Sequence, residues 1–254
     1  MTQKVALNKY TIWTQISMAL PKLGVPQYEL KLPSSGKTIK YRPFLVKEEK
    51  VLLVALESED EKQIINAVKN VLKACVISRV KVDQLPSFDL EYLFLKIRAA
   101  AVGEMIEMKV TCNDDNTTPV TANINIDDVE VFRPEGHTNK IMLTDTTGII
   151  MNYPSMDRFI QSQFLEKGIE TDEIFNFIAD HVDQLFDGEE VYDSSTTTKK
   201  EFREFIESLT TKQFESIQEF YESMPRLTHK FTVTNPNTGN ECEYTIEGLQ
   251  SFFG

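Results

Sequence analysis

The strand-like segments of this 254-residue chain occur in neighbouring pairs joined by short turns. Residues 105–112 and 120–126, for example, alternate apolar with polar side chains on either side of a loop rich in Asn, Asp and Thr. Strands joined by a short turn are antiparallel, whereas parallel strands need a long crossover between them. The pattern predicts an α+β fold, mainly helical, with several antiparallel β-hairpins and no parallel sheet. We expect the hairpins at residues 28–41, 105–126, 141–151 and 230–246.

Apolar residues spaced three and four apart fill much of the remaining chain and predict helices. Three of these segments begin with a capping box, in which a Ser or Thr is followed three residues later by Glu or Gln. The three boxes begin at Ser58, Thr198 and Thr210. We expect helices over residues 47–56, from the capping box at Ser58 to about residue 78, and over 87–102, 155–166 and 171–185, with two more between 198 and 225. The first is expected to be buried because residues 51–56 are all apolar, and residues 189–198 are expected to form a polar linker.

The sequence suggests a simple division of the chain. Residues 1–26 contain Pro21 and Pro26 and predict an irregular N-terminal arm. Residues 27–254 are predicted to form a single α+β domain, with a sub-boundary near residues 132–154.

Composition limits the partners of the chain. A formal net charge of −12 disfavours broad attraction to nucleic acid or anionic lipid. The longest apolar run is too short to span a bilayer, and the N-terminus lacks the basic stretch and apolar core of a secretion signal. Three scattered cysteines suit a reducing cytosol. Residues 171–195 are acidic without any Lys or Arg, which indicates either a solvated surface, the simpler interpretation, or a docking surface for a basic partner. We predict no nucleic-acid partner and no membrane span.

The segment Ser34-Ser35-Gly36-Lys37-Thr38 is similar to the end of a phosphate-binding loop. Such a loop needs a further glycine where this chain has Lys31, and its Lys-Thr opens a helix. Residues 38–41 instead alternate as a strand does. We therefore interpret the segment as a hairpin turn. A nucleotide-binding enzyme that uses Gly36, Lys37 and Thr38 is the less favoured alternative.

The remaining candidates for catalysis or metal binding carry no recognisable motif. His137, His181 and His229 belong to no spaced catalytic or metal-binding pattern. Cys112 and Cys242 fall in two similar hairpins, but neither has a second Cys or a His within four residues, as a zinc site usually requires. We therefore predict that the chain is not an enzyme and has no catalytic residues, cofactor or metal.

Aromatic and large apolar residues gather at the two ends of the chain. Ile12, Trp13 and Ile16 lie in the N-terminal arm, and Phe252 and Phe253 come just before the last residue. Aromatic side chains on terminal segments are typical anchors for binding partners. Trp13, Phe252 and Phe253 are therefore candidate interface residues. The alternative is that both ends fold back onto the core.

A resemblance to a known family lies in residues 18–58, MALPKLGVPQYELKLPSSGKTIKYRPFLVKEEKVLLVALES. This stretch has a hairpin with PSSGK at its turn, followed by YRPFLVKEEK leading into an aliphatic helix. It resembles the baseplate proteins of T4-like bacteriophages. The likeness continues more loosely to Ile77, to the hairpin near Cys112 and to the terminal GLQSFF. Residues 1–17 fall outside it, which leaves open an N-terminal extension or a start at Met18.

The resemblance implies a non-enzymatic structural or assembly protein of the baseplate hub, the plug at the tip of a contractile tail. It implies other hub proteins as partners, and a location in the tail baseplate of the virion after synthesis in the bacterial host cytoplasm. Whether the protein is a homo-oligomer is left open. The alternative is a hub-assembly chaperone that binds the same partners transiently and is absent from the virion.

The resemblance also selects a candidate partner interface at the end of the first hairpin and the start of the following helix. Charges of both signs stand there beside an aromatic residue, as at many interfaces. The candidate residues are Arg42, Phe44, Lys47, Glu48, Glu49 and Lys50. In the alternative interpretation, Phe44 belongs to the core, and Glu48 and Glu49 serve the helix dipole.

Overall fold

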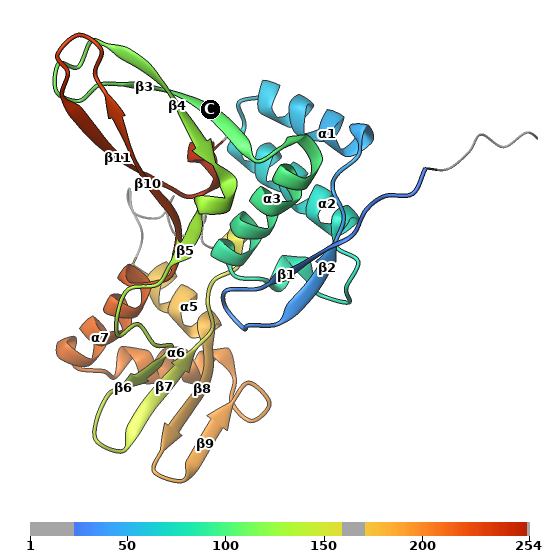
Figure 1. Ribbon diagram of the computed structural model, residues 1–254. Helices are drawn as coiled ribbons and strands as arrows, with labels where there is room; N and C mark the ends of the chain where they lie inside the picture. The colour runs from blue at the N-terminus through green and yellow to red at the C-terminus, as the bar shows by residue number, and fades with distance from the viewer. Residues whose placement is uncertain (1–22, 159–170, 253–254) are drawn as a thin grey trace, which may run out of the picture.

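The computed structural model describes residues 23–158 and 171–252. Trp13, Phe253 and the greater part of the helix expected over residues 155–166 lie outside these residues. The described residues form two large hydrophobic cores and one small one. Figure 1 shows the helices and strands that surround them.

The first core is formed mainly by two hairpins and three helices, and buried residues such as Met156, Leu227 and Leu249 join it from later parts of the chain. The bounds of these hairpin strands and helices are β1 Tyr28–Lys31, β2 Thr38–Tyr41, α1 Val46–Glu57, α2 Glu61–Cys75, α3 Ser87–Val102, β3 Met105–Thr111 and β4 Pro119–Asn125. Helix α3 runs through the centre, where Leu90, Leu93 and Ile97 are almost completely buried. These are the hairpins and helices that alternation and helical periodicity predict.

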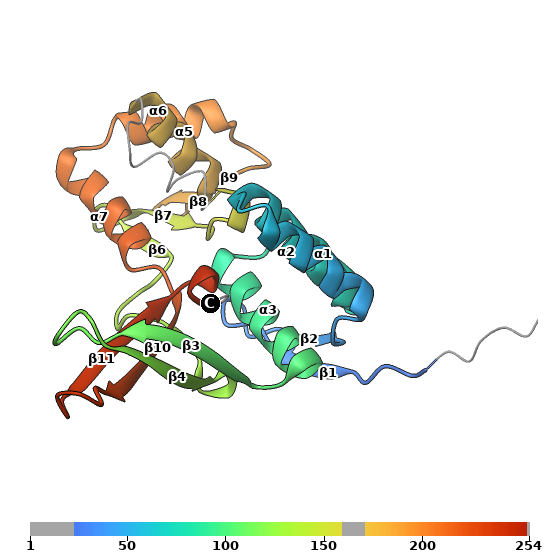
Figure 2. The ribbon, with the colours of Figure 1, turned by 90° about the horizontal axis from the view of Figure 1, so that it is seen from above.

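The second core lies between an antiparallel sheet and three helices that cover one of its faces (Figures 1 and 2). The strands are β6 Lys140–Met142, β7 Thr147–Met151, β8 Val182–Asp187 and β9 Glu190–Asp193, in that order across the sheet. The helices are α5 Thr171–His181, α6 Lys199–Glu207 and α7 Thr211–Glu222. The predicted capping boxes at Thr198 and Thr210 are confirmed.

Two predictions in this second core are wrong. Residues 182–187 form strand β8 rather than the end of a helix, and residues 190–193 form strand β9 rather than part of a linker. Val182 pairs with Met151 of β7, and Gly188, at φ +61°, lies in the turn between β8 and β9. A short apolar pattern fits either helix or strand, so the available partner strand decides the conformation.

The two large cores are connected by adjacent strands. The chain leaves the first core on β5 Glu130–Phe132, contacts it again at Ser155 and Met156, and returns to it on β10 Arg226–Thr234. Strand β10 pairs antiparallel with β5 and continues into β11 Glu241–Glu247. The second core is therefore inserted between two strands that lie side by side. After β11, a short 3-10 helix, η3 Leu249–Phe252, returns to α3.

Three hairpin turns share one backbone geometry. In each, a carbonyl oxygen accepts the N–H of the residue four positions later at 2.8 Å, and that later residue has a positive φ. The three residues are Gly36 at +68°, Asn116 at +55° and Gly239 at +79°. Glycine and asparagine tolerate this left-handed conformation best, which explains their place in the turns.

Replacing Gly36 by alanine should lower the free energy of unfolding by about 1 kcal/mol, because a Cβ is strained at positive φ. Gly24→Ala is the matched control: the φ of Gly24 is not positive, and an added Cβ would meet nothing within 4 Å. That variant should be as stable as the parent or slightly more so. Urea unfolding followed by circular dichroism measures both, and equal losses in the two variants would contradict the assignment of strain to the turn.

Three predictions differ from the structure: the cap of α2, the burial of α1, and the proportion of helix to strand. Ser58 ends α1, and Asp60 caps α2 in its place by accepting the N–H groups of Lys62 at 2.9 Å and Gln63 at 3.2 Å. Helix α1 is exposed along one side rather than buried. The fold contains more strand, relative to helix, than a mainly helical fold would.

Every strand pair among residues 23–158 and 171–252 is antiparallel. No helix there is long and apolar enough to cross a membrane.

Candidate functional site

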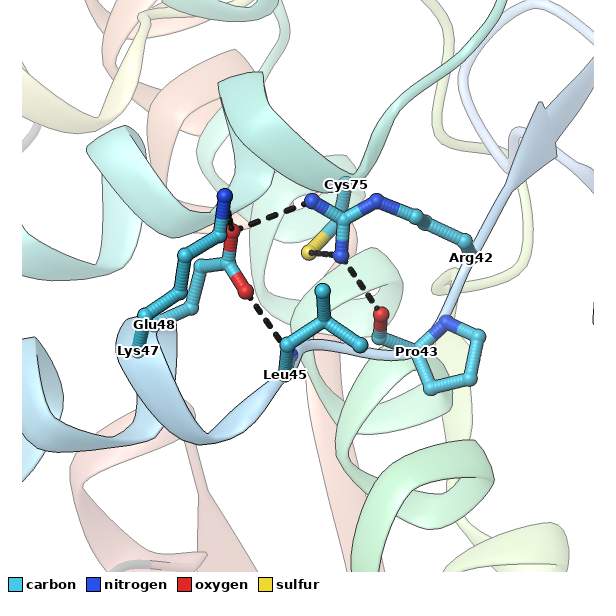
Figure 3. A network of polar contacts seen from close by, with 6 residues as sticks. All are labelled: Arg42, Pro43, Leu45, Lys47, Glu48 and Cys75. Atoms are coloured by element: carbon cyan, nitrogen blue, oxygen red, sulfur yellow. Dashed lines mark hydrogen bonds and ion pairs between the residues drawn. The ribbon is translucent and has the colours of Figure 1, made fainter. Parts of the chain in front are cut away.

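The N-terminus of α1 is held by an ion pair between Arg42 and Glu48 (Figure 3). Arg42 Nη2 lies 3.0 Å from Glu48 Oε1, and the two side chains are only 18% and 8% exposed. Arg42 Nη1 donates to the Pro43 carbonyl at 2.8 Å and lies 3.8 Å from Cys75 Sγ, while Glu48 Oε2 accepts the Leu45 N–H at 2.8 Å. The pair therefore joins the end of β2, the start of α1 and the end of α2.

Glu48 is ionised in spite of its burial. Burial alone raises the pKa of this carboxyl, but hydrogen bonds from Arg42 and from the Leu45 N–H, with the charges of Arg42 and Lys47, outweigh it and lower the pKa below its usual value. Burial raises the pKa of the Cys75 thiol to about 11, so this thiol stays protonated and belongs to the core. The network is a structural support for α1.

The other candidate interface residues are divided between core and surface. Phe44 is half-buried against the first core, and Glu49 is also half-buried. Lys47 and Lys50 are exposed. Phe252 is the last residue of η3. Of the six residues around the start of α1, the two lysines are thus the ones most open to a partner.

Helix α1 presents to solvent an apolar surface that was expected to be buried. Val46, Val51, Leu53 and Val54 are all exposed. Val46 is seven and eight residues before Leu53 and Val54, and Val51 is three before Val54, so Val54 lies near the middle of this exposed side. Val51 and Leu53 are two residues apart and therefore lie at its opposite edges. Six consecutive apolar residues advance by about 100° each and therefore point to every side of a helix. The sequence therefore already indicated that packing against one neighbouring helix could not bury all six residues.

A second polar cluster joins the turns of hairpins β3–β4 and β10–β11. The buried Asn235 side chain donates to Asp114 Oδ1 at 2.7 Å and to Asp115 Oδ2 at 3.0 Å. Asp114 Oδ2 accepts the Thr238 hydroxyl at 2.5 Å and the Asn240 amide at 3.2 Å. These hydrogen bonds, of which those from Thr238 and Asn235 have the largest effect, lower the pKa of Asp114 to about 2. The ionised carboxylate fastens one turn to the other.

Cys112 and Cys242 lie next to this cluster as buried free thiols. Their Sγ atoms and a carboxylate oxygen of Asp114 all lie within 4.8 Å of one another. A structural zinc ion takes four ligands, whereas this group offers three among the residues that the structure describes. Both oxygens of Asp114 also already accept hydrogen bonds. The donor set therefore does not fit a structural metal ion.

The three histidines all have hydrogen-bond partners within the fold. The two ring nitrogens of His137 lie 2.9 Å from the Ser223 hydroxyl and 2.9 Å from the Tyr153 hydroxyl. His181 and His229 bond to backbone carbonyls at 2.7 Å and 3.3 Å. Burial lowers the pKa of His137 and of His181, which favours their neutral forms. These contacts give the histidines structural roles.

The turn between β1 and β2 docks on α3. Ser34 donates its N–H to Asp89 Oδ1 at 2.9 Å and its hydroxyl to the other carboxylate oxygen. Asp89 is fully buried, and burial raises its pKa although the bonds from Ser34 oppose the shift. Strand β2 begins at Thr38, directly after Lys37, where a phosphate-binding loop would open a helix. The hairpin interpretation of this segment is confirmed.

A family model described as "T4 bacteriophage base plate protein" matches residues 25–254. The chain belongs to this family. The matched range includes α1 and the tips of both hairpins. Searches among curated proteins and among solved structures gave no match.

Membership in the family makes the chain a structural protein of the phage tail baseplate, where it contacts other baseplate proteins. The resemblance predicted from residues 18–58 is thereby confirmed at the level of the baseplate. A baseplate protein works through contacts with neighbouring subunits, so its uncovered apolar surfaces become the first candidates for function.

Proposed function

We propose that this baseplate protein is a non-enzymatic subunit of the baseplate hub, and that it binds another hub protein through the exposed side of α1. We call this surface the α1 face. It consists of Val46, Lys47, Lys50, Val51, Leu53 and Val54. The observation that carries the proposal is the exposure of four apolar side chains on one short helix. Exposed apolar side chains that gather on one element are a common mark of a protein–protein interaction site.

The α1 face is presented on a fixed support. The ion pair between Arg42 and Glu48 anchors the first turn of the helix. Helix α1 lies on the outer side of α2 in both views, away from the second core (Figures 1 and 2). A partner would therefore meet a preorganised surface, and little conformational entropy would be lost on binding.

The two lysines of the α1 face indicate the chemistry of the partner. Lys47 and Lys50 stand between the apolar residues in the helical order, and both are exposed. Their methylene groups extend the apolar surface, while their amino groups can pair with carboxylates at the rim of an interface. The partner surface that fits best is apolar at its centre and acidic at its edge.

Replacing Val54 by glutamate should weaken binding to the hub partner at least tenfold, because it places a carboxylate in the apolar part of the interface. Stability should change by less than about 0.5 kcal/mol, since the side chain is exposed. The test is complementation of phage whose own copy is inactivated, with infectious particles counted and the variant quantified in purified tails by mass spectrometry. We expect loss of infectivity and loss of the variant from the particles.

Val191→Glu is the matched control for this experiment. Val191 lies on β9 and is 56% exposed, against 58% for Val54, so both variants add the same charge at an equally open valine. The control should support normal incorporation and infectivity. If both variants fail, or if both succeed, the α1 face is not the interface.

The same particles test the hub role. Stoichiometric presence of the protein in purified baseplates supports a hub subunit, and its copy number relative to its neighbours shows whether it assembles with itself. Abundance in the infected-cell lysate together with absence from particles would overturn the proposal. That result would indicate a chaperone that binds hub proteins only during assembly.

A further inference from the structure

The tips of hairpins β3–β4 and β10–β11 pack together around the third core. Its buried residues are Cys112, Ala122, Val233 and Cys242. The two hairpins lie together in both views although they are distant in the sequence (Figures 1 and 2). Each contributes one cysteine to the contact, so any bond between the two thiols would join the hairpins directly.

The two sulfur atoms are close neighbours, and the Cys242 thiol also donates a weak hydrogen bond to Asp114 Oδ1 at 3.4 Å. Their Sγ atoms lie within 4.8 Å, both residues are almost completely buried, and both are free thiols. A disulfide needs Sγ atoms about 2.05 Å apart, and rotation about the Cα–Cβ bonds moves a sulfur atom by distances of this order. Disulfides that join two packed sheets are known from antibody domains.

We propose that Cys112 and Cys242 form a reversible disulfide between the two hairpins when the baseplate meets oxidising conditions outside the host cell. The inference rests on the baseplate family and on this geometry, and it does not depend on the hub role or on the α1 face. Thiols stay reduced inside a cell, whereas virion surfaces are oxidising environments. The same chain would thus hold its cysteines as thiols during assembly and as a disulfide in the released particle.

A small-molecule disulfide such as oxidised glutathione supplies the oxidising equivalents. One cysteine thiolate attacks it, forms a mixed disulfide and releases one thiol. The second cysteine thiolate then attacks the protein sulfur and releases the other thiol. In total, two cysteine thiols lose two protons and two electrons, and the small disulfide takes both up as two thiols.

Burial makes this exchange slow in the folded protein. Burial, with the neighbouring Cys242, raises the pKa of the Cys112 thiol, and both sulfurs are shielded from solvent. Several turn residues around them, including Asn113, Asp114 and Asn240, are exposed, so a local opening of the tips is enough to admit a small disulfide. We expect oxidation over minutes to hours, with a rate that rises with pH as more thiolate forms.

Closing the bond would enclose the whole second core in a covalent loop between positions 112 and 242. Cross-links that close long loops restrict the unfolded chain most, so the oxidised protein should be the more stable form. The expected change is a melting temperature several degrees higher after oxidation, which is lost again on reduction.

The test uses the full-length protein, equilibrated in glutathione buffers of increasing oxidised fraction and then alkylated after denaturation. We expect a single thiol to be alkylated at the oxidising end of the series. Peptide mass spectrometry should identify that thiol as Cys75 and should find Cys112 linked to Cys242. Cys75→Ala should keep the upward shift in melting temperature, and Cys112→Ala should lose it.

Other outcomes overturn the proposal. Three alkylated thiols under every condition would show that the pair cannot close, and links between chains or to glutathione alone would show that the geometry is wrong. Metal analysis that finds one zinc ion per chain, released by alkylation of the pair, would replace the disulfide by a metal site. The peptide mapping requires no variant, so the result stands even if a substituted chain fails to fold.

Discussion

Replacing Arg42 by methionine should lower the free energy of unfolding by about 3 kcal/mol, because it leaves the Glu48 carboxylate without its guanidinium partner inside the fold. The two side chains are 18% and 8% exposed, so water cannot replace the lost contact well. Methionine keeps an unbranched stem of similar shape, which limits the loss of packing. Chemical denaturation followed by circular dichroism measures the difference.

Lys47→Met is the matched control, because Lys47 contacts the same oxygen of Glu48. Its Nζ lies 3.4 Å from Oε1, but its side chain is 74% exposed, and an exposed ion pair contributes less than about 1 kcal/mol. A double variant, Arg42→Met with Glu48→Gln, should recover much of the loss because no unpaired charge remains. Equal losses for Arg42→Met and Lys47→Met would contradict the structural role of the buried pair.

Acid should reduce the difference between the parent and Arg42→Met. The folded state lowers the pKa of Glu48, so the contribution of this carboxylate is complete above its ordinary pKa and is lost as the pH falls through the lowered value. Below that value Glu48 is protonated in both proteins. A difference that stayed constant from neutral pH into acid would argue against an electrostatic origin.

Asn235→Ala should lower the free energy of unfolding by about 2–3 kcal/mol, because a fully buried side chain would lose hydrogen bonds to two carboxylates. The same side chain accepts the N–H of Asn237 at 2.8 Å and so also holds the turn after β10. The loss should be accompanied by faster maleimide labelling of Cys112 and Cys242, since the two hairpin tips would separate more often.

Asn240→Ala is the control for this second substitution. Asn240 is exposed and makes one side-chain bond to Asp114, at 3.2 Å, so its removal should cost less than about 1 kcal/mol. Labelling of the two cysteines should then stay close to that of the parent. If the two variants were equally destabilised, or if labelling did not change in Asn235→Ala, the cluster would not be what fastens the tips together.

Local chemistry explains why much of the fold could be predicted. The hairpin at 28–41 depends on a turn with Gly36, and the helices that begin after Thr198 and Thr210 depend on capping boxes. Each of these interactions joins residues that are only a few positions apart in the sequence. Such interactions do not need the rest of the chain to be known. The resemblance in residues 18–58 likewise lies in one continuous segment, and that segment was enough to indicate the baseplate family.

The candidate site was less predictable because its character depends on contacts between distant segments. Arg42 and Glu48 look like surface charges in the sequence, and only their packing beside Cys75 shows that they support the fold. The apolar run from Val51 was predicted to be buried, but α2 covers only one side of α1, so the other side of the helix is exposed.

By itself the sequence determined the antiparallel hairpins, most of the helices and the family, because turn residues, caps and periodic apolar residues act over a few positions. Tertiary structure decided the rest. Strand β8 exists because β7 offers backbone partners to a segment that could equally be helical. Cys112 and Cys242 meet because two hairpins from different parts of the chain pack at their tips. Burial and strand pairing between distant segments depend on which surfaces pack together in the folded protein. The spacing of residue types along the sequence does not show which surfaces these are.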